Sequence, residues 1–451
     1  MIERHILKEL LNWKEKTNRK PLIIRGARQV GKTTLIKSFS KSYQNKILLN
    51  LEKTADKRIF ESFENISDII DVLLLKFKLS PDKTNELLIF IDEIQESTAA
   101  IKYLRYFYEE YPEIHVIAAG SLLEFALKDV ENFPVGRVEY LYMHPLNFRE
   151  YLNAMNHEYA IEHLSHIPVT PSAHSVLIEL FKSYAIVGGM PEAVKMYVEE
   201  KKIAGLTRIY ESLWETFSDD MTKYATNKTE LNVMRHIVNT AYLNLDARIK
   251  FQHFGNSNYK SREVGEAMRT LENARFLFLI YPTTEVEYPI RPDYKKSPRL
   301  QFLDSGLINY KNGVQAELLT SGELSGNYSG YLIPHLVTQE IMSINSFSNT
   351  KPNFWVREKS QSSAEVDLVV HYSGKIIPIE IKSGEVGKLR SLHQFMDRVN
   401  HNFAVRIYGG EFNIQKAVTP NNKKFWLMNL PYYLSIKIYD YLELLLSNDL
   451  N

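Results

Sequence analysis

The chain has 451 residues, more than one hydrophobic core ordinarily holds, so we expect about three or four domains. Hydrophobic residues make up 44% of it and the formal net charge is +1, so the composition is that of a globular protein and no global field draws it to nucleic acid or to a membrane. The absence of cysteine excludes disulfides, thiolate metal sites and a cysteine nucleophile.

Residues 20–150 alternate short apolar runs with helical patterns. The runs, each interpreted as a strand, are Pro21–Arg25, Lys46–Leu51, Leu87–Ile91, His115–Ala119 and Val138–Tyr142. Strands that alternate with helices predict a parallel sheet covered by helices on both faces. No run is long enough to span a bilayer, and the N-terminus lacks an apolar stretch of signal-peptide length. We therefore expect a soluble, cytoplasmic protein that does not bind membranes.

The first of these strands leads directly into a phosphate-binding motif. Gly26–Thr33 fits the pattern G-x-x-x-x-G-K-[ST] between a strand and a helix, where backbone N–H groups and the helix N-terminus surround a phosphate. Lys32 is expected to reach the β- and γ-phosphates, and the Thr33 hydroxyl to bind Mg²⁺. The residues assigned to the nucleotide are Gly26, Ala27, Arg28, Gln29, Val30, Gly31, Lys32, Thr33 and Thr34.

An acidic pair, Asp92 and Glu93, ends the strand Leu87–Ile91. Such a purely apolar run is typical of a central parallel strand whose C-terminal end faces the ligand. Asp92 is expected to hold Mg²⁺ through water, and Glu93 to orient or deprotonate the attacking water. The alternative, a chance loop followed by a helix cap, is disfavoured because both motifs occur in order and in their proper context.

Two later residues are further candidates for this site. Ser121 follows the strand His115–Ala119, where its hydroxyl could sense the γ-phosphate. Arg137 precedes the strand Val138–Tyr142 and could serve as an arginine finger. A serine at a strand end is also a common helix cap, and an arginine is a common surface charge, so both alternatives stay open.

The middle of the chain has mainly helical patterns. A break at Gly188–Pro191 predicts that one helix ends and another begins within residues 151–225. Ser261 is expected to cap a helix that runs to Ala274, followed by the strand Phe276–Ile280. The apolar face of that helix is expected to hold Val264, Met268 and Leu271.

The same helix is a candidate DNA contact. Arg262 and Arg269 lie seven residues apart and hence on one face, although neighbouring glutamates dilute their charge. Contact with DNA and a role as a spacer both stay open. A stretch rich in Gly and Ser at 321–331 then predicts a boundary before the last domain.

A hairpin with the two-residue turn Ser373–Gly374 is predicted near the C-terminus. Its register places Asp367 opposite Glu380 and Glu365 opposite Lys382 on one face. The other face is expected to hold Val366, Leu368, Ile379 and Ile381. Opposed carboxylates repel unless they are compensated, and a divalent metal is the natural compensation. Lys382 could stabilise charge on a phosphate, while a solvent-facing hairpin with ordinary charges is the alternative.

Residues around the hairpin could complete such a site. Glu340, within the helical stretch Pro334–Ser343, could supply a third carboxylate to the metal, although a lone helical glutamate is more often solvated. The following helix is basic, which fits a nearby phosphate backbone without specifying one. Its basic residues are Lys388, Arg390, His393 and Arg398.

Together these motifs resemble those of a large prokaryotic family of AAA-superfamily ATPases whose C-terminal domain is related to PD-(D/E)xK nucleases. Besides the P-loop and the hairpin, the matching segments are Ile91–Gln95, Ala119–Ser121, Gly136–Arg137, His144–Leu146, Gly188–Pro191 and Phe302–Gly306. The resemblance implies an α/β multidomain fold. Its expected parts are a P-loop NTPase (AAA/ASCE) parallel sheet at 1–150, a helical lid at 151–225, a winged-helix-like domain at 226–320 and a small α/β restriction-endonuclease-like domain at 321–451.

The resemblance also implies ATP and Mg²⁺ as cofactors, and it assigns Asp367, Glu380 and Lys382 to the nuclease-fold triad. Two hypotheses follow for the whole protein. In the first, ATP state is coupled to DNA binding or to metal-dependent DNA cleavage. In the alternative, the protein is an ATP-dependent switch or regulatory binding module whose nuclease-like domain does not cleave. DNA is a candidate partner and a homo-oligomer a candidate assembly.

Overall fold

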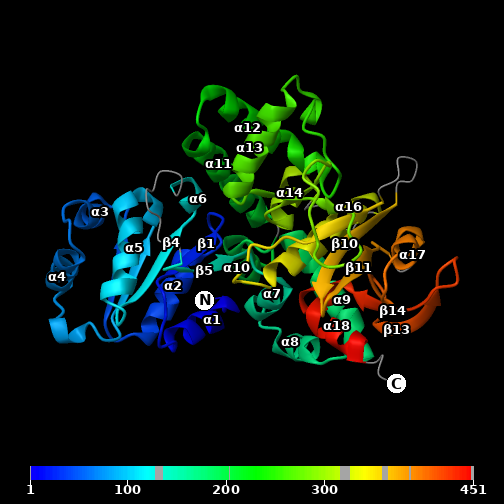
Figure 1. The fold of residues 1–451 in the computed structure, drawn as a ribbon, viewed down its shortest axis with the longest axis horizontal. Helices are drawn as coiled ribbons and strands as arrows, with labels where there is room; N and C mark the ends of the chain where they lie inside the picture. Colours follow the sequence, from blue (N-terminus) through cyan, green and yellow to red (C-terminus); the bar gives the residue numbers. More distant parts are fainter. Residues whose placement is uncertain are drawn as a thin grey trace.

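The computed structural model describes residues 2–126, 136–202, 204–314, 326–357, 364–384 and 388–447. Figure 1 shows an N-terminal α/β unit, in blue and cyan, on one side of the molecule and a second sheet, in yellow to red, on the other. Helices coloured green lie between and above them. Within the described ranges, no helix is both long and apolar enough to cross a membrane.

The N-terminal sheet is parallel throughout and has the strand order β2-β3-β4-β1-β5. Its strands are β1 (Leu22–Gly26), β2 (Lys46–Asn50), β3 (Leu88–Asp92), β4 (His115–Gly120) and β5 (Glu139–Met143). The predicted strands and their parallel direction are confirmed. Strand β4 lies between β1 and β3, which is the additional-strand arrangement that the abbreviation ASCE denotes.

Helices cover both faces of this sheet, as the alternating pattern predicted. They are α1 (Ile6–Lys14), α2 (Lys32–Phe39), α3 (Thr54–Glu61), α4 (Ile66–Phe77), α5 (Thr98–Glu110) and α6 (Leu123–Ala126). Successive residues of a strand point to opposite faces. Ile24 of β1 accordingly belongs to the same core cluster as Ile36 of α2, whereas Ile23 belongs to the cluster that contains Leu104 of α5. Each fully buried side chain of this size contributes roughly 1.5–3 kcal/mol, so both faces stabilise the sheet.

A helical segment follows, with a sharp break where the sequence predicted one. Its helices are α7 (Phe148–Ala154), α8 (Glu158–Ser165), α9 (His174–Val187), α10 (Pro191–Glu200) and α11 (Ala204–Tyr224). Gly188 has φ of 81°, and a Cβ there would lie 2.4 Å from an Asp304 carboxylate oxygen. That buried carboxylate accepts the N–H of Gly189 at 2.6 Å and the N–H of Gly306 at 2.9 Å. Two motifs more than a hundred residues apart are thus joined.

The next segment contains α12 (Lys228–Thr240), α13 (Ser261–Asn273), β6 (Leu277–Ile280), β8 (Arg299–Phe302) and α14 (Ser305–Lys311). Strands β6 and β8 form a two-stranded antiparallel sheet. The predicted apolar face of α13 is confirmed, since Val264, Met268 and Leu271 are buried. The predicted cap is wrong by one residue, because Lys260 precedes the helix and its N–H donates to the Glu263 carboxylate at 2.8 Å.

The C-terminal sheet is mixed and has the order β13-β14-β12-β11-β10-β9-β7. Its strands are β7 (Pro282–Thr283), β9 (Asn353–Val356), β10 (Glu365–Tyr372), β11 (Lys375–Ile381), β12 (Phe403–Tyr408), β13 (Asn413–Val418) and β14 (Lys424–Pro431). The accompanying helices are α16 (Gly326–Ser343), α17 (Arg390–Met396) and α18 (Ile438–Ser447). Residues 315–325 lie outside the described ranges, and so does the boundary expected at 320/321.

The predicted hairpin register is confirmed from Tyr372, which pairs with Lys375, to Leu368, which pairs with Ile379. The prediction that Val366 shares a face with Leu368, Ile379 and Ile381 is wrong. The pairing of β10 with β9 shifts between Val366 and Val369, as at a β-bulge. Val366 therefore packs in a different core cluster from Leu368, although strict alternation would put both on one side.

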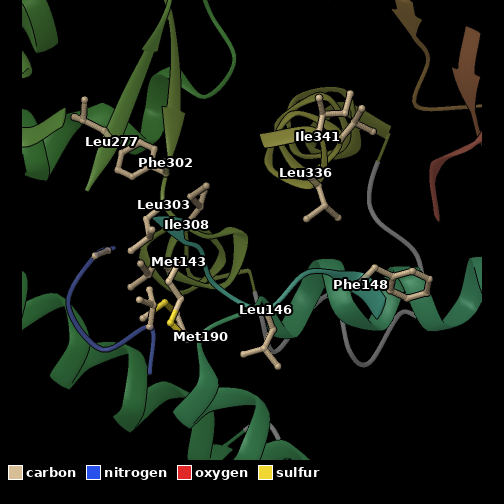
Figure 2. Close-up of a cluster of buried hydrophobic side chains, with 14 of the residues drawn as sticks. Met143, Leu146, Phe148, Met190, Leu277, Phe302, Leu303, Ile308, Leu336 and Ile341 are labelled. Atoms are coloured by element: carbon tan, nitrogen blue, oxygen red, sulfur yellow. The ribbon is translucent and has the colours of Figure 1, made fainter. Parts of the chain in front are cut away.

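One continuous core joins these parts. It includes residues from β5, the helical segment, the β6–β8 region and α16. Figure 2 shows this convergence around Met143, Leu146, Met190, Leu303 and Leu336. The parts consequently share apolar contacts, while one face of the N-terminal sheet and part of the C-terminal sheet have clusters of their own.

Glu340 lies in this interior and not beside the hairpin carboxylates. Its residue surface is 1% exposed, and its carboxylate accepts the N–H of Phe148 at 3.0 Å and the hydroxyl of Tyr184 at 2.8 Å. The expectation that Glu340 joins Asp367 and Glu380 is therefore corrected: α16 turns this side chain toward α7 and α9. Burial raises the pKa of Glu340 to about 8.

We predict that Glu340→Gln stabilises the protein increasingly as pH rises. Below pH ~4.5 the carboxyl is neutral in both folded and unfolded chains. Between that pH and about 8, the unfolded chain releases a proton that the folded protein keeps, so wild type loses up to about 1.4 kcal/mol per pH unit. Thermal unfolding from pH 5 to 8 measures the difference. The exposed Glu179→Gln is the control, and a gap that does not change with pH would contradict a protonated Glu340.

Candidate functional site

The loop between β1 and α2 has the backbone geometry that its glycines predicted. A Cβ on Gly26 would lie 2.5 Å from the carbonyl oxygen of Met143 in β5, which no side chain tolerates. Gly31, at the start of α2, has φ of 96°, in the left-handed region that favours glycine. The loop therefore turns tightly over the sheet edge and directs the first N–H groups of α2 toward the space above it.

Lys32 is buried at the mouth of this loop. Its ammonium group donates to the carbonyl oxygens of Gly26 at 3.0 Å and Ala27 at 2.9 Å. Burial lowers the pKa of Lys32 to about 8, while the carboxylates of Glu93 and Asp92 raise it. The group thus remains mainly protonated at neutral pH, as binding of phosphate requires.

Thr33 and Asp92 are brought together although they are 59 positions apart in the chain. The Thr33 hydroxyl donates to the Asp92 carboxylate at 2.7 Å. Asp92 ends β3, and burial raises its pKa. Mg²⁺ binds hydroxyl and carboxylate oxygens together with water, so this pair fits the ion. Thr33 and Asp92 would hold the ion, which would neutralise phosphate charge when bound.

Glu93 stands next to this pair and is held by a residue that sequence reasoning gave no role. Its φ of 51° places it in the left-handed region, and its carboxylate accepts the side-chain N–H of Gln95 at 2.6 Å. Gln95 in turn lies against the end of β4, because a Cβ on Gly120 would be 2.2 Å from its amide oxygen. Ser121 follows directly and is buried at the same edge.

The helical segment contacts the P-loop through Arg28. Its guanidinium donates to both carboxylate oxygens of Asp220 in α11, at 2.5 and 2.6 Å. Asp220 is buried, and Lys223 lies 3.3 Å from it. No local signal indicates this pair, because its members are 192 positions apart.

Arg137 lies at the N-terminal ends of the parallel strands, whereas the P-loop lies at their C-terminal ends. Glu139 pairs with Leu22 at the start of β1, whereas Met143 pairs with Gly26 at its end. Four residues of strand span about 13 Å, so Arg137, which precedes Glu139, is at least that far from the level of Gly26. Its guanidinium lies 3.1 Å from Glu109, at the end of α5. The structure does not bring Arg137 to the nucleotide site of its own chain.

The hairpin carboxylates face an arginine that the sequence did not indicate. Arg299 of β8 donates to Glu365 at 2.8 Å through Nε, and its Nη2 lies 3.3 Å from Asp367. The Lys382 ammonium lies 2.6 Å from Glu380, not beside Glu365 as expected. Burial and the charge of Asp367 raise the pKa of Glu380. Asp367 and Glu380 thus lie close enough to interact, but cationic side chains compensate both.

These residues do not fit a metal centre as they are arranged. One oxygen of Asp367 faces Arg299, and the other accepts the N–H of Ile381 at 2.8 Å. In the described part of the chain, no three carboxylate or histidine side chains gather in a way that could hold a metal ion. Oxygen Oε2 of Glu380 is buried without a hydrogen-bond partner among the described residues, so one acceptor remains.

Family comparison identifies the N-terminal unit. A model described as AAA domain matches residues 18–152, and two models described as domains of unknown function (DUF8612 and DUF4143) match residues 178–318 and 329–433. Over residues 18–152 the chain is therefore similar to AAA domains, and the P-loop and parallel sheet described above agree with that class. No curated protein matches the chain.

Several solved structures are similar in outline. The Walker-type ATPase PABY2304 of Pyrococcus abyssi is 14% identical, with a TM-score of 0.45, over 69% of this chain and 96% of that one. A signal-transduction ATPase with numerous domains and a tetratricopeptide-repeat sensor, PH0952 from Pyrococcus horikoshii, is 14% identical, with a TM-score of 0.29, over 76% and 48%. The Hsp104–ADP complex of S. cerevisiae is 15% identical, with a TM-score of 0.28, over 61% and 39%.

We predict that Glu93→Gln binds ATP with near wild-type affinity but hydrolyses it slowly. The amide has the size and shape of the carboxylate and cannot accept the proton of water, which typically costs about 10²–10⁴-fold in rate. Phosphate release and equilibrium nucleotide binding measure the two properties separately. The exposed Glu96→Gln is the control. Normal turnover of Glu93→Gln would assign the base to another residue.

Proposed function

We propose that the protein binds ATP with Mg²⁺ and hydrolyses it at the edge formed by β1, β3 and β4. The observation that carries this proposal is the 2.7 Å contact between Thr33 and Asp92, which joins the P-loop to the acidic strand. The AAA match over residues 18–152 supports the same class of reaction. We propose ATP and not another nucleotide because the resemblance to AAA-superfamily ATPases favours it.

Each residue of the site has a distinct chemical role in this proposal. Lys32 and the N–H groups of the loop bind the β- and γ-phosphates, and Thr33 and Asp92 hold Mg²⁺. Glu93 accepts a proton from the water that attacks the γ-phosphorus, while the bond to the β–γ bridging oxygen breaks. Gln95 orients Glu93 through their 2.6 Å hydrogen bond. In this proposal the Ser121 hydroxyl contacts the γ-phosphate.

We further propose that the protein is a nucleotide-dependent switch whose C-terminal domain does not cleave nucleic acid in the arrangement described. The order α16, β9, β10, β11, α17, β12 supports a nuclease-like fold, and α12, α13 and the β6–β8 sheet support a winged-helix-like region. Arg299 favours the switch over cleavage, because its guanidinium lies where a metal would have to compensate Asp367.

Metal-dependent DNA cleavage remains the second candidate function. It is favoured by the buried, unpartnered oxygen of Glu380 and by Lys382 beside it. DNA contact through α13 is weakly supported, since Arg262 is exposed but paired with Glu266 at 2.8 Å. Arg137 could serve as an arginine finger only in a homo-oligomer, because it would have to reach the nucleotide bound to a second copy.

We expect Lys32→Ala to abolish ATP binding and turnover, because the phosphates lose their principal cation. Isothermal titration and phosphate release measure both properties. Lys41→Ala, an exposed lysine just beyond the same helix, is the control for general effects of losing a positive charge. Wild-type hydrolysis by Lys32→Ala would remove the basis of the ATPase proposal.

We expect wild-type protein that hydrolyses ATP to leave DNA uncut. Duplex, single-stranded and branched DNA should be tested with Mg²⁺ or Mn²⁺, with and without ATP, beside Asp367→Ala. Absence of cutting under every condition agrees with the switch. Cutting that Asp367→Ala abolishes would establish the second candidate, and cutting only with ATP would show that nucleotide binding releases the acidic site.

A further inference from the structure

A buried arginine from the middle of the chain reaches the AAA domain. Arg275 stands between α13 and β6 with φ of 59°, and it is 6% exposed. Its guanidinium carbon lies 4.8 Å from the centre of the Tyr142 ring in β5, and Nη1 donates to the side-chain oxygen of Asn349 at 3.0 Å. A residue of the 204–314 segment is thereby held against the sheet that carries the P-loop.

Arg275 lies at the C-terminal ends of the strands of that sheet, as the nucleotide site does. Tyr142 pairs with Arg25, the residue before Gly26, so its ring marks the level at which the P-loop begins. Glu124, 3.9 Å from Arg275, belongs to α6, which begins two residues after Ser121. The charge of Arg275 also contributes to the lowered pKa of Lys32. Arg275 therefore lies near the P-loop, whereas Arg137 lies at the other end of the strands.

The positive charge of Arg275 is incompletely compensated. Across the described ranges, the only carboxylate within 4 Å is that of Glu124, at 3.9 Å, and Glu124 makes its shorter contact of 2.6 Å with Arg25. Burial lowers the pKa of Arg275. A buried guanidinium without a close anion is unfavourable, whereas a phosphate oxygen offers a charge-assisted and often bidentate partner.

We propose that Arg275 contacts the terminal phosphate of ATP within its own chain and stabilises the charge that develops there during hydrolysis. This inference rests on the proposed ATPase function and adds a catalytic residue from outside the AAA domain. Arg275 would move from its contact above Tyr142 toward the phosphate beside Lys32. Water attacks the γ-phosphorus, its proton goes to Glu93, and the bridging oxygen leaves with ADP, so Arg275 acts only as a cation.

This role requires parts of the chain that are distant in sequence. Asn349, the partner of Arg275, lies in the segment after α16, and Ser346 of that segment accepts the Tyr142 N–H at 2.6 Å. The AAA domain, the α13–β6 turn and the C-terminal part therefore meet around one guanidinium. Binding of the terminal phosphate to Arg275 would therefore affect the contacts among all three parts.

The test compares Arg275→Gln and Arg275→Lys with wild type. Hydrolysis at saturating ATP should fall on the order of 100-fold or more in Arg275→Gln, toward the roughly 10³-fold that such arginines can supply, and less in Arg275→Lys. In a Glu93→Gln background, affinity for ATP should fall at least about tenfold while affinity for ADP changes less than about threefold. Retained ADP binding shows that the variant is folded, and Arg235→Gln, exposed on α12, is the matched control.

Several results would overturn the proposal. Equal losses for ATP and ADP would assign Arg275 a purely structural role, and unchanged hydrolysis would exclude it from the reaction. Restored activity on mixing Arg275→Gln with Lys32→Ala would mean that it acts on another copy. If wild-type protein neither binds nor hydrolyses ATP, the ATPase proposal itself fails, which is a separate outcome.

Discussion

The contact between Thr33 and Asp92 is the constraint on which the rest of the site depends. It exists because the parallel strand order places the ends of β1 and β3 at one edge, with β4 between them. Parallel strands expose their carboxyl ends together, so a loop after β1 and an acidic residue after β3 must meet there. Lys32, Glu93 and Ser121 then take their positions from backbones that the sheet already holds.

A second constraint orients the remaining parts around that edge. The buried carboxylate of Asp304 accepts N–H groups from Gly189 and Gly306, which joins the helical segment to the β6–β8 region. Burial raises the pKa of Asp304 to about 6, so its ionised form depends on these backbone donors. The apolar core around Met143 and Leu303 then closes over this joint. The result is one continuous core that joins the helical segment and the β6–β8 region to the N-terminal sheet.

The β6–β8 sheet connects both candidate sites. Arg275 precedes β6 at the end where Leu277 pairs with Phe302, and Arg299 begins β8 at the other end, opposite Ile280. Leu277 and Ile280 are three residue steps apart along β6, roughly 10 Å. One short sheet therefore presents an arginine to the AAA domain and another to the hairpin carboxylates. Arg299 compensates the charges of Glu365 and Asp367, and the hairpin register alone did not indicate this.

Local patterns were sufficient where neighbouring residues determine the outcome. The P-loop, the acidic strand, the parallel sheet and the turn Ser373–Gly374 follow from glycine conformations, apolar periodicity and strand pairing, all of which act over a few residues. Tertiary structure decided where Arg275, Arg299 and Asp220 lie and which partners they have. It also decided the interior position of Glu340 and the distance of Arg137 from the P-loop. Their partners lie tens to hundreds of positions away. Such contacts depend on how the elements pack, because a buried charge takes whichever partner the completed fold brings near it.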